Sequence, residues 1–165
     1  MVYISVLGHC PRVSKKIVKE AVQFFANQLM SPRIVATLDI TVRFDFEFYK
    51  KHKFSGEVEV IDDVFPPRMF NLNLDSCRPR IRMFELIAHE IVHVKQYAIG
   101  ELKDEYVRNP HKVRFRNEYH YMDEPHEEGW DWDYDTPWEI EAYGREYGLT
   151  SRFILHLKKL DMLKS

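Results

Sequence analysis

Polar and apolar residues alternate most regularly between positions 38 and 48. Apolar side chains occupy every even position from Leu38 to Phe48, and polar or charged ones occupy the odd positions between them. A period of two residues puts successive side chains on opposite faces of a β-strand, so this stretch predicts one long, two-faced strand. Shorter alternations predict strands over 57–60 and 70–75. Because these three strands follow one another with short links, we expect an antiparallel meander.

Two other stretches have the helical period. Residues 15–30 carry an apolar stripe, with Ser14 as a candidate N-cap and Ser31-Pro32 as the stop. A second stripe runs from about position 80 to Ile99, with Gly100 in the position that often follows a helix C-terminus. The residues of this second stripe that we expect to face the sheet are Phe84, Ile87, Ala88, Ile91 and Val92.

The remaining segments complete the predicted architecture. Residues 2–7 form a short apolar strand, and two helices are expected over about 137–147 and 151–163, the first opened by Thr136 and Pro137. Residues 101–135 look irregular, although 113–121 is compatible with a strand. We therefore predict a single α+β domain over residues 1–165. An N-terminal helix and a small, mostly antiparallel sheet would pack on the helix at 80–99, followed by C-terminal helices.

Composition limits the class of protein without adding chemistry. The chain has 165 residues, 45% of them hydrophobic and 30% charged, as expected for one globular domain. The net charge of -2 provides no overall field that would attract nucleic acid or a membrane. Cys10 and Cys77 form no C-x-x-C pair, and no signal peptide or membrane-spanning run is apparent, so we expect a cytoplasmic protein with idle thiols. The sequence gives no indication of oligomeric state.

Candidate chemistry lies in the helix at 80–99, which contains His89-Glu90-Ile91-Val92-His93. On a helix, His89 and His93 lie one turn apart on one face, with Glu90 beside them. This is the H-E-x-x-H arrangement of zinc hydrolases, in which the histidines bind the metal and the glutamate is a general base.

A catalytic zinc usually has three protein ligands and one open position. Extended versions of the motif would place Gly at position 96 and His or Asp at position 99. Gln96 and Ile99 exclude those metzincin and aspzincin patterns. The remaining common arrangement takes a glutamate from a later helix, and the segment from Pro137 to Tyr143 offers two.

H-E-x-x-H followed by a helix with Glu139-Ile140-Glu141-Ala142 resembles the gluzincin class of zinc metallopeptidases. In size and element order the chain is similar to the small members of that class, the minigluzincins and the SprT-like or phage-type zincin domains. The resemblance implies a zincin-like fold, a Zn²⁺ ion and hydrolysis of peptide bonds. Related gluzincins carry E-x-x-A-D or E-x-x-A-N. Glu139 would then bind zinc, Ala142 would let the two helices approach, and Tyr143 stands where the family has Asp or Asn.

The third ligand has alternatives. Thr136 and Glu139 also fit a capping box, in which Glu139 would reach back to the helix start and leave Glu141 as the ligand. Residues two positions apart point roughly 200° apart around a helix, so only one of the two glutamates can face the metal. Glu139 is the first choice and Glu141 the second. His120, together with His111 or His126, is a further alternative.

The expected reaction needs a base and a donor for developing negative charge. Bound zinc lowers the pKa of a water to about 7. Glu90 would accept the proton of that water and later pass it to the leaving amine. Candidate oxyanion donors or residues that support the ligands are Tyr119, His120, Tyr121 and Tyr143.

The expected partner is a protein or peptide substrate, held as an added strand at a sheet edge. SprT-like proteases work around DNA, so the resemblance also implies a nucleic-acid alternative, although the net charge does not favour it. A catalytically inactive zincin that serves as a binding module is a third hypothesis. The basic groups that bear on the nucleic-acid alternative are Arg78, Arg80 and Arg82, and Arg108, Lys112, Arg114 and Arg116.

Overall fold

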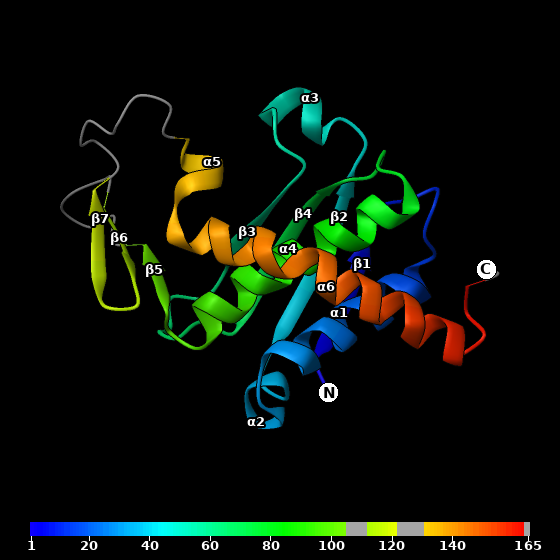
Figure 1. Ribbon diagram of the computed structural model, residues 1–165, viewed down its shortest axis with the longest axis horizontal. Helices are drawn as coiled ribbons and strands as arrows, with labels where there is room; N and C mark the ends of the chain where they lie inside the picture. The colour runs from blue at the N-terminus through cyan, green and yellow to red at the C-terminus, as the bar shows by residue number, and fades with distance from the viewer. Residues whose placement is uncertain (105–111, 122–130, 164–165) are drawn as a thin grey trace.

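A computed structural model describes residues 1–104, 112–121 and 131–163 of the chain (Figure 1). The fold belongs to the α+β class, as predicted. Its main sheet has four strands in the order β1-β2-β4-β3. These strands are β1 (Tyr3–Leu7), β2 (Asp39–Asp45), β3 (Gly56–Val60) and β4 (Met69–Asp75).

The direction of the strands corrects the predicted meander. β1 pairs with β2 in parallel, β2 pairs with β4 in parallel, and only β3 is antiparallel to its neighbour, β4. The prediction of a mostly antiparallel sheet beneath the helix at 80–99 was therefore wrong. The link between β2 and β3 is long enough to pass the end of β4, so strands adjacent in sequence are not adjacent in the sheet. β3 lies at the outer edge as a result.

β2 is also shorter than its alternating pattern suggested. The strand ends at Asp45, and the backbone N–H of Glu47 donates to Asp45 Oδ1 at 2.8 Å. Phe46 is 68% exposed, and Phe48 begins a short helix, α3 (Phe48–His52). The alternation at positions 46 and 48 was therefore not a strand, because a carboxylate that binds backbone two residues onward turns the chain.

The two predicted amphipathic helices are confirmed. α1 (Lys15–Leu29) is capped by Ser14, whose side chain accepts from the N–H of Ile17, and it is followed by the short α2 (Pro32–Val35). α4 (Arg80–Ala98) ends just before Gly100, which has a φ of 78°. A positive φ is the conformation that glycine adopts most readily after a helix.

The C-terminal region is one helix rather than two. α6 (Pro137–Lys159) has 23 residues and runs through Gly144 and Gly148 without a break. The prediction treated this glycine-containing stretch as a boundary. Its buried positions continue with helical spacing on both sides, so packing on the core outweighs the low helix propensity of glycine. The buried residues of α6 are Trp138, Ala142, Leu149, Thr150, Phe153 and Leu157.

A second sheet occupies the region that looked irregular. Its strands are β5 (Leu102–Asp104), β6 (Lys112–Phe115) and β7 (Glu118–Tyr121), all antiparallel. Arg116 and Asn117 connect β6 to β7 with φ values of 48° and 70°. Two positive φ angles define a tight hairpin turn that usually contains glycine, so the sequence Arg-Asn gave little signal.

The layers of the molecule bring α4 and α6 together. α1 and α4 pack on the main sheet, and α6 crosses in front of them (Figure 1). Phe153 of α6 is in ring contact with Phe25 of α1 and Phe84 of α4, so all three helices share one core. Cys10 is buried, Cys77 is exposed, and both thiols are free. Within the described ranges, no helix has both the length and the apolar character needed to cross a membrane.

Candidate metal centre

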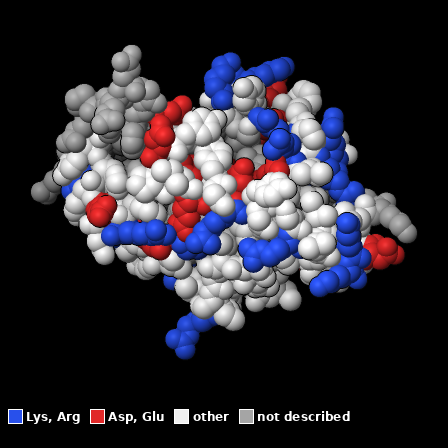
Figure 2. All heavy atoms as spheres, in the orientation of Figure 1, with Lys and Arg blue, Asp and Glu red and all other residues white. Residues whose placement is uncertain are grey.

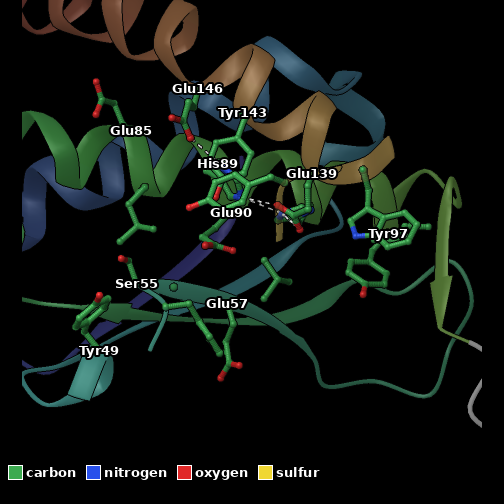
Figure 3. Close-up of a pocket in the computed structure, with 18 of the residues that line it drawn as sticks. Tyr49, Ser55, Glu57, Glu85, His89, Glu90, Tyr97, Glu139, Tyr143 and Glu146 are labelled. Atoms are coloured by element: carbon green, nitrogen blue, oxygen red, sulfur yellow. Dashed lines mark hydrogen bonds and ion pairs between the residues drawn. The ribbon is translucent and has the colours of Figure 1, made fainter. Parts of the chain in front are cut away.

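Three candidate ligands converge where α4 meets the start of α6 (Figure 3). His89 and His93 lie one turn apart on α4, and their Nε2 atoms are 3.1 Å apart. Glu139 approaches both rings, at 3.2 Å from His89 Nε2 and 3.3 Å from His93 Nε2. All of the ligand atoms of this group lie within 4.8 Å of one another.

The far side of each imidazole is held by a second side chain. His89 Nδ1 lies 3.0 Å from Glu146 Oε2, and His93 Nδ1 lies 2.9 Å from Gln96 Oε1. When Nδ1–H donates to these oxygens, the lone pair of each Nε2 points to the common centre, which is the tautomer that binds metals. Neither the contact of Glu146 with His89 nor that of Gln96 with His93 was predicted from the sequence. Their signals were spacing alone: two turns after Glu139 and one turn after His93.

Ala142 and Tyr143 lie at the crossing of the two helices. Ala142 is fully buried, so a small side chain allows α6 to approach α4 closely, as the resemblance implied. The ring of Tyr143 packs edge-on against His89, with centroids 4.5 Å apart. Tyr143 therefore contacts the ligand histidine by its ring, while Glu146 makes the hydrogen bond.

The electrostatics of the centre favour a cation. Burial opposes protonation of His89, but its hydrogen bonds to Glu139 and Glu146 outweigh burial and raise its pKa to about 10. The pKa of His93 is also raised, because Glu139 outweighs the effect of burial. Burial likewise opposes ionisation of Glu139, yet the two histidines lower its pKa to about 2. When the histidines give up their extra protons, two nitrogen lone pairs and a carboxylate face one point, a set that fits a divalent metal of the zinc type.

Glu90 lies beside this centre, between α4 and the edge strand β3. Its side chain is almost fully buried, and burial raises the pKa of its carboxyl group. Gly56 of β3 comes so close that a Cβ there would lie 2.6 Å from Glu90 Oε1. A glycine at this position is therefore what lets β3 approach the carboxylate.

Comparison of the chain with protein-family models, with curated proteins and with solved structures finds no match.

Glu141 points away from the centre, into a network of cations. Its carboxylate lies 3.0 Å from Lys95 Nζ and 2.9 Å from both Arg116 Nη2 and Arg145 Nε. Gln96 Nε2 donates to it at 3.2 Å. Burial opposes ionisation, but Lys95 and Gln96 outweigh it and lower the pKa of Glu141. Of the two alternatives from sequence, the structure brings Glu139 and not Glu141 to the histidines.

The centre opens into a cavity of about 770 Å³ whose lining includes the candidate ligands, Glu90, Tyr134 and Tyr143. Tyr143 stacks on Tyr134 of α5 (Trp132–Asp135), with ring centroids 5.1 Å apart. The pKa of the Tyr143 phenol is raised, mainly by burial and to a smaller extent by nearby charges and a hydrogen bond. The phenol therefore stays protonated and able to donate. Tyr134 was not among the sequence candidates.

The other predicted oxyanion candidates are not brought to the cavity lining. Tyr119, His120 and Tyr121 lie on β7, and His120 packs against the ring of Trp138 at a centroid distance of 5.3 Å. Lys112 Nζ lies 3.5 Å from the ring centroid of Tyr119. His111, His126 and Arg108 are outside the described residues.

The basic residues do not form one continuous positively charged surface on the viewed face (Figure 2). Arg78 and Arg82 line the cavity, where they pair with Asp75 at 3.3 Å and Glu85 at 2.7 Å. Arg80 Nη1 donates to the carbonyl of Leu163 at 3.1 Å. Figure 2 shows Lys and Arg side chains in separate groups on the viewed face, with acidic atoms between them.

Proposed function

We propose that this protein is a zinc-dependent peptidase of gluzincin type with a zincin-like fold. The observation that carries the proposal is the convergence of His89, His93 and Glu139, with the buried Glu90 beside them. The order of the elements supports it as well: a sheet with an antiparallel edge strand, then the H-E-x-x-H helix, then the glutamate from a later helix.

His89, His93 and Glu139 would hold the ion, and Glu146 and Gln96 would keep the histidine rings in place. Zinc supplies Lewis acidity and activation of water at such a site. Glu90 is the general base that accepts a proton from the attacking water and returns it to the leaving amine. Burial raises its pKa, which moves this carboxyl group in the direction that favours both transfers.

Two tyrosines on the cavity wall are candidates for steadying the developing oxyanion. Tyr134 and Tyr143 both line the cavity, and the raised pKa of Tyr143 keeps its hydroxyl protonated. A phenol that donates to developing negative charge stabilises the transition state.

Edge strand β3 is where we expect an extended peptide to bind. It pairs with β4 on one side, and Gly56, Glu57 and Val58 line the cavity. Backbone N–H and C=O groups along an edge strand can pair with an added strand, which would place a peptide bond near Glu90.

Metal content and peptide cleavage test the proposal. The purified protein should contain one zinc per chain, and His89→Ala should lose it. Glu90→Gln should retain zinc and fold while cleavage falls by about two orders of magnitude or more, the range attributed to a general base. Comparison of metal content in Glu139→Ala and Glu141→Ala tests the third ligand, and only the first should lose zinc.

Other outcomes would favour the alternatives. Stoichiometric zinc without cleavage of any peptide would favour a catalytically inactive binding module. A salt-dependent shift of DNA in a gel would favour action at nucleic acid. Absence of zinc from the wild-type protein would contradict the metal centre itself.

A further inference from the structure

The cavity continues past the metal centre into a side pocket at the C-terminal end of α4. We call this the distal pocket and define it by the five residues that line the cavity there. Figure 3 shows Tyr97 at the end of the cavity opposite Tyr49, with His89 and Glu139 between them. The residues of the distal pocket are Tyr97, Leu102, Asp104, Val113 and Trp138.

The distal pocket adjoins the metal centre along both helices. Tyr97 follows His93 by four residues on α4, so the two side chains share a face and lie about 6 Å apart along the helix axis. Trp138 directly precedes Glu139 on α6. A substrate side chain next to the scissile bond, on this side of the centre, would therefore enter the distal pocket.

Its walls are apolar except for one carboxylate. Leu102 and Asp104 lie on the same face of β5, and Asp104 is directly opposite Val113 on β6. Leu102, Val113 and Trp138 belong to one buried apolar cluster, with Tyr97 packed against it. A charged residue at an otherwise apolar position of two paired strands calls for a physical reason.

Asp104 has one hydrogen-bond donor and no cationic partner among the described residues. The hydroxyl of Tyr97 donates to its Oδ2 at 2.8 Å. Burial raises the pKa of Asp104, and the hydrogen bond from Tyr97 partly offsets that effect. The neighbouring cation Lys103 reaches instead toward the ring of Phe65, 5.2 Å from its centroid. The carboxylate thus lies in the pocket with capacity to accept another partner.

We propose that Asp104 makes the distal pocket a specificity site for a lysine or arginine side chain of the substrate. This inference rests on the proposed peptidase function. The methylenes of such a side chain would lie along Leu102, Val113 and Trp138, and its cation would pair with Asp104. An uncharged side chain of equal length leaves the partly buried carboxylate without a counter-ion, and an acidic one places like charges together.

At the opposite end of the cavity, two arginines already have acidic partners. Arg78 and Arg82 line this end, and they pair with Asp75 and Glu85 respectively. Among the described residues, Asp104 differs from these two arginines in having no oppositely charged partner.

Matched peptides test the assignment. Each carries lysine, norleucine or glutamate at one of the two positions that flank the scissile bond, and cleavage is measured with the zinc-loaded protein. We expect kcat/KM for lysine to exceed that for norleucine by about tenfold or more at one of the positions, since charge-assisted pairs in a desolvated pocket have about that effect. Asp104→Asn should reduce this ratio to within about twofold.

Glu118→Gln is the matched control, because Glu118 is an exposed carboxylate on β7 of the same sheet and does not line the cavity. It should keep the wild-type ratio. A wild-type ratio near one, or a ratio retained in a folded Asp104→Asn, would overturn the proposal. The wild-type panel needs no variant, so a folding defect in Asp104→Asn does not prevent a decision.

A binding measurement separates this inference from the proposed function. Fluorescence anisotropy of the same labelled peptides with zinc-loaded Glu90→Gln reports the distal pocket without cleavage. If the wild-type protein cleaves no peptide, the peptidase proposal fails, while selective binding of the lysine peptide that Asp104→Asn removes would still support the pocket. Equal binding of the lysine and norleucine peptides would overturn it.

Discussion

His89 is held between two carboxylates, one at each ring nitrogen. Glu139 contacts Nε2 and Glu146 contacts Nδ1. Glu146→Gln keeps a hydrogen-bond acceptor but removes the charge that orients the ring and makes it a better ligand. We expect zinc affinity to fall about 10- to 100-fold with the fold intact, the usual effect of losing such a partner. Competition with a chromophoric chelator measures the affinity.

The chain provides a matched control for this variant. Glu20 on α1 lies 2.7 Å from His156 Nε2 of α6. This second glutamate–histidine pair is partly exposed, lies beside Phe153 and is not part of the metal centre. Glu20→Gln should leave zinc affinity unchanged. If both variants lose the same amount of zinc affinity, Glu146 affects zinc binding only by stabilising the folded protein and not by orienting His89.

The raised pKa of His89 gives zinc binding a defined pH dependence. In the metal-free protein that pKa is about 10, against an ordinary value of 6.5, so His89 is protonated at neutral pH and must lose its proton to bind metal. Between pH 7 and 9 the apparent association constant should rise about tenfold per pH unit for each proton released. Calorimetry in buffers with different heats of protonation counts those protons. An affinity that does not change with pH over this range would contradict the prediction that His89 releases a proton when zinc binds.

At the scale of single residues, the sequence was informative where chemistry has a fixed spacing. The pentapeptide identified His89, Glu90 and His93 as a group because ligands one helical turn apart form a recognisable pattern. The orientation of Glu139 was open, because the capping box and the metal site make equal use of that position. Glu146 was missed because its contact with His89 depends on how α6 crosses α4. Gln96 was missed because a glutamine one turn after a histidine on the same helix belongs to no recognisable motif.

Among the elements, α6 can be tested directly, because it is one continuous helix where the sequence predicted two. Gly144 and Gly148 are exposed in this continuous helix, and a Cβ at either would meet no atom within 4 Å. Each Gly→Ala change should stabilise the protein by about 0.5–1 kcal/mol, because alanine loses less backbone entropy and favours the helix. Urea unfolding measures the gain.

Gly56→Ala is the opposite case, because its Cβ would lie 2.6 Å from Glu90 Oε1 and 2.9 Å from Leu86 Cδ1. It should destabilise the protein and disturb Glu90. If Gly144→Ala and Gly148→Ala also destabilise, the helix is interrupted there and the two-helix prediction would be restored.

Helices and strands could be predicted where their buried residues recur at a regular spacing. α1 and α4 each present one apolar stripe to the sheet, so period alone found them. α3 and the end of β2 were misassigned because Asp45 redirects the chain within an unbroken alternation. The turn at Arg116 and Asn117 lacks glycine, which is why β6 and β7 were left as an uncertain segment.

For the whole molecule, the prediction of the α+β class was confirmed, whereas the predicted antiparallel meander was wrong about the order and direction of the strands. Alternation says which face of a strand is buried but not which strand lies beside it. Placing β4 between β2 and β3 has a consequence for the candidate site: it leaves β3 at the edge, next to Glu90 and the cavity. The relation between sheet edge and metal centre is thus a property of the assembled chain.

The proposed metal centre joins parts of the chain that are distant in sequence, so a zinc ion bound there should stabilise the entire domain. Its ligands come from α4 and from the start of α6, and the same α6 carries Phe153 into the shared core with Phe25 and Phe84. A ligand that binds only the folded state at 1,000 times its Kd adds about 4 kcal/mol to the free energy of unfolding.

For a chain of this size, that gain corresponds to a rise in Tm of roughly 8–16 °C. Calorimetry with zinc and with excess chelator should show one transition that shifts as a whole, because α6 cannot detach from the ion without leaving the core. His89→Ala should melt at the same temperature in both conditions. A zinc-dependent shift that persists in His89→Ala would point to metal bound elsewhere. Two separate transitions would mean that α6 and the sheet unfold independently, and that the centre fixes only a local contact.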